Sequence, residues 1–267
     1  MPSNGRAQHR HLLSMRGFAA SATQRPSQPQ SILERVLPRS LVPYAQLTRL
    51  DKPIGTWLLA PLAAGTLSTT QAAVFLGAQL VAGLGILVQL NEYSIVLGAS
   101  SLALVFTYPL MKRITFWPQA FLGLTFNWGA LLGWAAVQGS CDWLVVLPLY
   151  AGGVCWTLVY DTIYAYQDKD DDNMVGIKST ALRFADSPRL WLSGFAAAQV
   201  ALLALTGWSM DMALPFYTGL GGVAGHLMWQ ISTVELESRQ DCLSKFKSNR
   251  DLGAVMFTGI LLDKLIA

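Results

Sequence analysis

Charged residues are scarce in this sequence. Only 13% of its 267 residues are Asp, Glu, Lys or Arg, about half the share that is usual in a soluble domain, while 52% are hydrophobic. Its three cysteines lie far apart without any Cys-x-x-Cys pair, so a disulfide framework is excluded and a zinc site has no support. A chain so poor in charge and so rich in apolar residues is typical of a membrane protein.

The net positive charge of the chain comes from its first 40 residues. Residues 1–40 hold six Arg, one Glu and no Lys, a net of +5, whereas the other 13 basic and 15 acidic residues leave a net of −2. This balance excludes a basic surface for nucleic acid. An Arg- and Ser-rich segment without a long apolar core is typical of a mitochondrial transit peptide, with an ordinary disordered tail as the alternative. We therefore expect a leader over 1–40 and a membrane domain over 41–267.

Long apolar runs follow from residue 71 onward. Their length predicts an all-α, multi-pass transmembrane helical bundle with about seven full spans. A further apolar segment at 53–64 is too short to cross a bilayer, which needs roughly 20 residues. The seven predicted spans are 71–90, 93–111, 119–137, 143–160, 190–208, 213–231 and 251–267.

Basic residues alternate between the loops in a regular way. The loops after the second, fourth and sixth predicted spans carry Lys and Arg, whereas the loops near Asn91, Gly139 and Asp211 carry none. Only Lys264 falls on or near the wrong side. Because basic loops stay on the inner side of a membrane, this pattern fixes the expected orientation of the spans.

Five aspartates lie within twelve residues at the end of the fourth span. If the helix continues, Asp161, Asp168 and Asp172 share one face within roughly 20°. Three like charges at a helix C-terminus are costly without a cation, and such oxygen ligands suit Mg²⁺ shared with a phosphate. The alternative is a solvated acidic loop, which is how we interpret Asp170. Asp161 directly continues an apolar run, where an ionisable group is a functional candidate.

Four further candidate residues lie in the second and third spans and in the inner loop. Tyr108 and Lys112 occupy positions i and i+4 and could reach an anion held by the aspartates, although a snorkelling basic anchor is the alternative. Asn127, in the middle of the third span, is expected to bond a neighbouring helix or a ligand. Lys178 lies in the inner loop, where a diphosphate could meet it.

Four motifs resemble the UbiA superfamily of intramembrane aromatic prenyltransferases. The resemblance covers roughly 44–267 and is closest to the branch that prenylates 4-hydroxybenzoate in mitochondrial ubiquinone synthesis. The matching motifs are RLDKPIGTWLL (49–59), TYPLMKR (107–113), LTFNWGALLGW (124–134) and YDTIYAYQDKDDDNMVGIKSTA (160–181).

The resemblance implies a pocket built by nine helices in which Mg²⁺ holds the diphosphate of a polyprenyl donor. Loss of diphosphate gives an allylic carbocation, which the phenol ring then attacks, and the buried cavity excludes water. It assigns Asp161, Asp168 and Asp172 to the second Asp-rich motif and Tyr108 and Lys112 to the diphosphate contact. Arg49 belongs to the first-helix motif and is implied to bind the aromatic carboxylate.

The family's first Asp-rich motif is missing from this sequence. No Asp occurs between Asp51 and Asp142, and Ala60 is followed directly by Pro61, as if two helices had been removed together. Both ends of such a hairpin lie on the inner side, so the later spans keep their orientation.

The resemblance implies a Mg²⁺-dependent enzyme of the mitochondrial inner membrane with its aspartates facing the matrix. Its expected partners are polyprenyl diphosphate, 4-hydroxybenzoate, the lipid bilayer and proteins of ubiquinone synthesis. The alternative is a catalytically impaired membrane protein that binds prenyl lipid or that machinery. A seven-span carrier is disfavoured, because its ionisable cluster would lie mid-membrane.

Overall fold

A computed structural model describes residues 68–174 and 176–266 of the chain. The leader over 1–40, the short apolar segment 53–64, Arg49 and the junction at Ala60 therefore lie outside the described residues. Every regular element in the described part is a helix, which confirms the all-α prediction.

The chain divides between Gly83 and Leu84 into two units. In the first unit the structure describes the beginning of helix α5 (Thr69–Leu87). Its start is set by a reciprocal cap, because Ser68 Oγ accepts the Gln71 amide at 3.2 Å and Gln71 Oε1 accepts the Ser68 amide at 2.9 Å.

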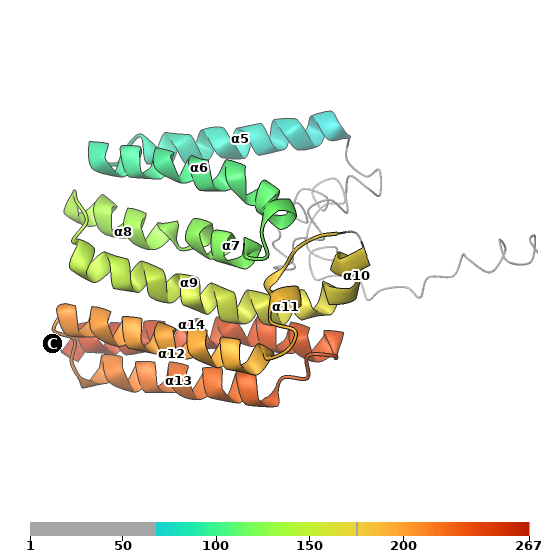
Figure 1. Cartoon of the computed structure of the whole chain (residues 1–267). Coiled ribbons are helices and arrows are strands. Elements are labelled where there is room, and N and C mark those ends of the chain that lie inside the picture. Colours follow the sequence, from blue (N-terminus) through green and yellow to red (C-terminus); the bar gives the residue numbers. More distant parts are fainter. Residues whose placement is uncertain (1–67, 175, 267) are drawn as a thin grey trace, which may run out of the picture. The chain divides into compact units, whose positions relative to one another are not determined.

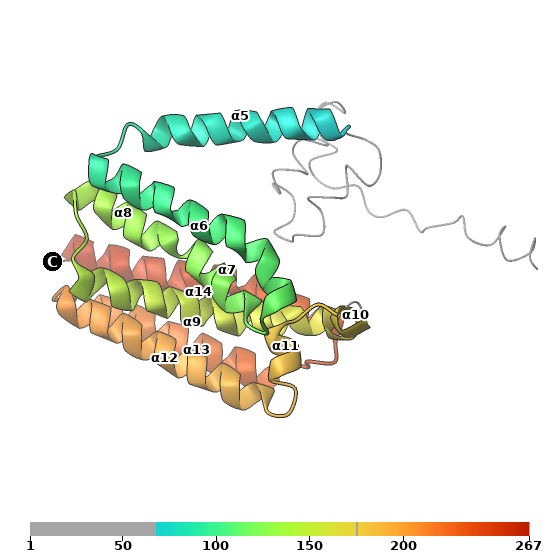
Figure 2. The same ribbon diagram turned by 45° about the horizontal axis from the view of Figure 1, so that its top comes forward.

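Helix α9 is the central element of the second unit. It runs over Trp143–Ala165 and packs against α7 (Pro118–Phe126) and α8 (Trp128–Gln138), and also against α12 (Pro188–Ser209) and α14 (Arg239–Ile266). Figure 1 shows these two groups of helices on either side of α9, and Figure 2 shows α8 and α12 on opposite sides of it. Its side chains are therefore positioned from both sides, which matters for the candidate site at its C-terminal end.

The remaining elements complete this unit. Helix α6 (Glu92–Ile114) packs on α7 and α8. Helix α13 (Leu214–Thr233) packs against both α12 and α14. Short elements connect α9 to α12: the 3₁₀ helix η2 (Tyr166–Asp168), α10 (Lys169–Met174) and α11 (Thr180–Arg183). They carry the polar segment that follows the fourth predicted span.

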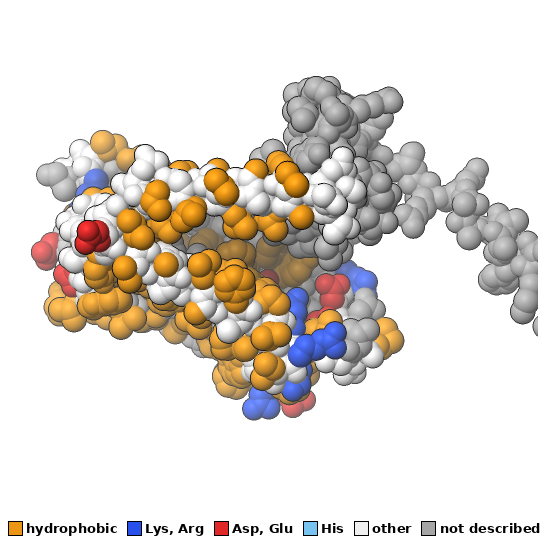
Figure 3. Space-filling model, turned by 90° about the horizontal axis from the view of Figure 1, so that it is seen from above, with side chains coloured by type: hydrophobic (Ala, Val, Ile, Leu, Met, Phe, Trp, Pro, Cys, Tyr) orange, Lys and Arg blue, Asp and Glu red, His pale blue; other side chains and the backbone are white. Residues whose placement is uncertain are grey.

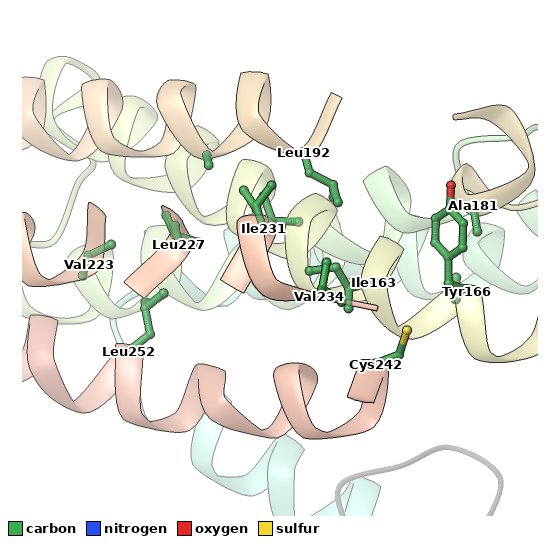
Figure 4. Close-up of a cluster of buried hydrophobic side chains, with 13 residues drawn as sticks. Ile163, Tyr166, Ala181, Leu192, Val223, Leu227, Ile231, Val234, Cys242 and Leu252 are labelled. Carbon is green, nitrogen blue, oxygen red and sulfur yellow. The ribbon is translucent and has the colours of Figure 1, made fainter. Parts of the chain in front are cut away.

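The largest apolar core lies among α9, α12, α13 and α14. Figure 4 shows side chains of these helices turned toward one another, among them Ile163, Leu192 and Leu227, which are at most 1% exposed. Between membrane helices such side chains stabilise by close van der Waals packing and not by removal from water, and this packing supports α9.

Five described helices are long and apolar enough to cross a membrane. They correspond to the first five predicted spans. The sixth and seventh predicted spans fall on α13 and α14, which are helices of 20 and 28 residues but are not in that set. Helix α14 carries Lys245, Lys247, Arg250 and Asp251 in its first half, so its mean hydropathy is low. The number of seven spans stays a prediction.

Charge is distributed unevenly along the helices. Figure 3 shows most of the visible Lys and Arg side chains gathered at one end, with hydrophobic side chains over the flanks of the helices. That end carries Lys112 and Arg113 of α6 together with α10 and α11. The arrangement agrees with the alternation of basic loops along the sequence.

Candidate active site

The C-terminal end of α6 and the last turns of α9 bring three predicted residues together. Lys112 and Tyr108 of α6 both interact electrostatically with the carboxylate of Asp161 on α9. Tyr108 and Asp161 are half-buried, whereas Lys112 is exposed. An ammonium and a phenol on α6 thus lie within electrostatic range of a carboxylate on α9, at the basic end of the fold.

The position of Asp161 is fixed by its buried neighbour on α9. The hydroxyls of Thr162 and Thr180 lie 2.7 Å apart, and both residues are fully buried. The amide of Thr180 donates to Gln119 Oε1 at 3.0 Å, which ties α11 to α7 as well. Uncharged polar residues in apolar helices were the available sequence signal for this link, but spacing alone does not reveal the pairing.

The prediction that Asp161, Asp168 and Asp172 lie on one face of a continuous helix is wrong. Helix α9 ends at Ala165, and the chain then passes through η2 before α10 begins at Lys169. A 3₁₀ helix turns about 120° per residue instead of 100°, so its three residues shift the later side chains by about 60°. Asp168 is exposed and Asp172 is half-buried, and neither continues the line of Asp161.

No group of three His, Cys, Asp or Glu side chains within the described ranges is placed to hold one metal ion. The donor set still fits magnesium in another way. Mg²⁺ prefers hard oxygen ligands and is usually bound by one or two carboxylates together with substrate phosphates and water. The aspartates of this segment therefore suit an ion shared with a phosphate group and do not form a cage made of protein ligands alone.

Lys178 lies against the end of α6. Its amide donates to the Lys112 carbonyl at 2.9 Å, and its Nζ donates to the Ile114 carbonyl at 3.1 Å. The ammonium also lies 5.4 Å from the centre of the Phe116 ring. The two predicted lysines are thus brought together by backbone pairing between the loop after α10 and the end of α6.

Asn127 separates α7 from α8. Its Nδ2 donates to Thr157 Oγ1 on α9 at 3.0 Å and to the Gly123 carbonyl at 2.8 Å. Its side chain also fills the space where a Cβ on Gly153 would lie. The expected bond to a neighbouring helix is confirmed, and a contact of Asn127 with substrate stays a prediction.

Comparison with models of known protein families agrees with the prenyltransferase motifs. The model of the UbiA prenyltransferase family matches residues 59–259. The chain belongs to the UbiA prenyltransferase family. Members of this family are generally dependent on divalent metal ions.

Similar proteins from several organisms carry one name. The mitochondrial 4-hydroxybenzoate polyprenyltransferase of Arabidopsis thaliana is 49% identical over 88% of this chain and 72% of its own length. The proteins of that name from Homo sapiens and Rattus norvegicus are 48% and 47% identical over 85% and 92% of this chain, and 77% and 82% of their own lengths. Close homologues are thus mitochondrial prenyltransferases, as the motifs predicted.

Two solved structures share the fold. A UbiA homologue from Aeropyrum pernix K1 has a TM-score of 0.64 at 22% identity, covering 84% of this chain and 82% of its own. A digeranylgeranylglyceryl phosphate synthase has a TM-score of 0.59 at 13% identity, covering 85% and 80%. These similarities support the UbiA-like bundle that the sequence predicted.

The alignments also contain positions that this chain lacks. The human protein aligns over 285 positions, which include 85% of these 267 residues, or about 227, so about 58 positions have no counterpart here. The Arabidopsis alignment, with 291 positions and about 235 residues of this chain, leaves about 56. This deficit has the length of about two membrane helices with their loops, and its assignment to the Asp-rich hairpin stays a prediction.

Proposed function

We propose that this chain transfers a polyprenyl group from polyprenyl diphosphate to the ring of 4-hydroxybenzoate in ubiquinone synthesis. The observation that carries the proposal is the meeting of Lys112 and Tyr108 with Asp161 in a member of the UbiA family. The names of its relatives support the choice of 4-hydroxybenzoate as acceptor. Arg49 is proposed to bind the carboxylate of that acceptor.

The diphosphate is proposed to lie between α6 and the segment after α9. Lys112, with the Tyr108 hydroxyl beside it, donates to its oxygens and stabilises the charge that grows as the C–O bond breaks. Lys178 adds positive charge from the adjoining loop. Bound Mg²⁺, shared with the diphosphate and held by one or two carboxylates among Asp161, Asp168 and Asp172, would neutralise the phosphate oxygens that these aspartates could not approach alone.

The broken bond leaves diphosphate and an allylic cation. The ring carbon beside the phenol hydroxyl attacks this cation, and the ring then loses its proton. Water must be kept from the cation, and the apolar helices around Asp161 support that role. Asn127 lies between α7 and α8 and is bonded to Thr157 on α9. It is proposed to contact the substrate from that side of α9.

The proposed location is the mitochondrial inner membrane, with Asp161, Asp168 and Asp172 facing the matrix. The gathering of Lys and Arg at the same end as these aspartates supports this orientation. Association with other proteins of ubiquinone synthesis is part of the same proposal.

A second candidate function rests on the positions that the chain lacks. Without the first Asp-rich motif, the protein is a membrane protein that binds prenyl lipid or the ubiquinone-synthesis machinery with little catalysis. The deficit of about 56–58 aligned positions favours this alternative.

One assay separates the two candidates. The purified full chain in liposomes is given labelled polyprenyl diphosphate, 4-hydroxybenzoate and Mg²⁺, beside a chimera in which the absent hairpin of a relative is restored. Labelled product from both proteins, abolished in each by D161N, is expected for the enzyme. Product from the chimera alone would establish the second candidate, and D161N turnover equal to that of the parent would remove the site assignment.

A further inference from the structure

A groove lies between α12 and α13, away from the candidate active site. Its volume is about 740 Å³, within the range of ligand sites. On α12 its lining runs from Arg189 to Ala204, a length of about 22 Å at 1.5 Å per residue. It is lined largely by small and aliphatic side chains, among them Ala197, Ala201 and Ala224.

The groove opens on the outer flank of the helices. Ala197, Ala201 and Met228 are exposed, and α12 is one of the helices able to cross a membrane. In a membrane this flank meets lipid acyl chains. The length of the groove exceeds half of the ~30 Å hydrocarbon core, so one extended acyl chain from a single leaflet can lie along it.

The polar end of the groove lies at the basic end of the fold. Arg189 stands there with Ser193 and Ser232, and its Nη2 donates to the Val234 carbonyl at 3.3 Å. Nearby charges are Arg183 and Asp186 before α12 and Glu235 and Glu237 after α13. Within the described residues Arg189 forms no ion pair with any carboxylate, so its guanidinium keeps donors for an anion.

We propose that this groove binds an anionic phospholipid of the leaflet at the basic end. The phosphodiester accepts hydrogen bonds from Arg189, the two serine hydroxyls stand beside the headgroup, and one acyl chain lies along the alanines. Apolar length and a cation at one end are the two features that such a lipid requires. The site is independent of the proposed prenyl transfer.

Native mass spectrometry of the full chain in detergent tests the proposal. Phosphatidylglycerol and phosphatidylcholine with identical acyl chains are titrated separately, and the affinity of the first bound lipid is compared. Phosphatidylglycerol is expected to bind about tenfold more tightly, the size expected of a charge-assisted contact. R189Q is expected to abolish this preference, while R183Q, which removes an exposed charge outside the groove, retains it.

A second variant tests the acyl part. A201W fills the groove and is expected to weaken both lipids about tenfold, whereas G194L, at a position on α12 with open space around it, leaves binding unchanged. A retained preference in R189Q, or unchanged binding in A201W, would overturn the proposal. A dimer that A201W dissociates would overturn it as well, because the groove would then hold a second copy.

Discussion

The amide of Lys178 donates to the carbonyl of Lys112 at 2.9 Å, so the polar loop after α10 is paired with the end of α6. The pairing places Lys178 beside Lys112, whose ammonium interacts electrostatically with the carboxylate of Asp161, although the three residues come from separate parts of the chain. The site is therefore held by backbone geometry as well as by charge, and its parts can be tested one by one.

Lys112 is expected to be essential for prenyl transfer. K112M removes the ammonium that stabilises the leaving diphosphate and should lower kcat/KM by about 100-fold, as loss of one such donor does elsewhere. R113Q removes the neighbouring charge, for which the structure gives no contact with Asp161, and serves as the control. Steady-state kinetics on both variants decide, and equal losses would reduce Lys112 to a membrane anchor.

The aspartates after α9 are expected to differ in importance. D168N should raise the Mg²⁺ concentration that gives half-maximal turnover at least tenfold, because a ligand is lost. Asp170 is interpreted as a solvated residue, so D170N should leave that Mg²⁺ concentration unchanged. Chelation of Mg²⁺ with EDTA should stop turnover of the parent. Identical metal dependence of the two variants would contradict the assignment of Asp168.

The buried hydroxyl pair of Thr162 and Thr180 is expected to stabilise the fold. T162V leaves the other hydroxyl unpaired and should lower the free energy of unfolding by about 1–2 kcal/mol. T162V/T180V removes both and should recover part of that loss. T258V, at an exposed residue of α14, is the control. Melting in detergent measures all four proteins, and additive losses would argue against a direct bond.

Two glycines in helices offer a matched pair of substitutions. A Cβ on Gly153 would overlap the side chain of Asn127, so G153A should destabilise the protein by about 1–3 kcal/mol. Gly194 has open space, and G194A should stabilise it by about 0.4–1 kcal/mol. Thermal unfolding checks both signs. If G153A proves neutral, the close packing of Asn127 on α9 is wrong.

Cys242 is expected to react slowly with alkylating reagents. Burial raises the pKa of its thiol to about 11, and the side chain is 0% exposed. Because the pKa of the thiol is higher in the folded protein than in the unfolded chain, its ionisation does not affect folding stability below about pH 9. Above that pH the free energy of unfolding falls as pH rises toward 11. Iodoacetamide labelling followed by peptide mapping should modify half-buried Cys141 first at pH 8. Prior labelling of Cys242 would contradict its burial.

The sequence was sufficient to predict the principal contact of the site. An i, i+4 pair at the end of one apolar run and an aspartate at the end of another, on the same side of the membrane, had to meet if the helices packed side by side. The structure confirms that Tyr108 and Lys112 lie near Asp161.

Other features could not be predicted from local pattern. No Gly or Pro marks the end of α9 at Ala165, so the 3₁₀ turn that rotates Asp168 away has no local signal. The pairing of Thr162 with Thr180 depends on where a loop folds back. The seventh predicted span begins twelve residues after α14 does, because its polar first turns still continue the helix.

The most direct test of the account is Mg²⁺-dependent binding of an unreactive polyprenyl thiolodiphosphate to the full chain, which requires no turnover. We predict binding that disappears with EDTA, weakens at least tenfold in D161N and stays unchanged in D170N. Equal affinity of the parent and D161N, with or without Mg²⁺, would contradict the claim that Asp161 and its basic neighbours hold the diphosphate.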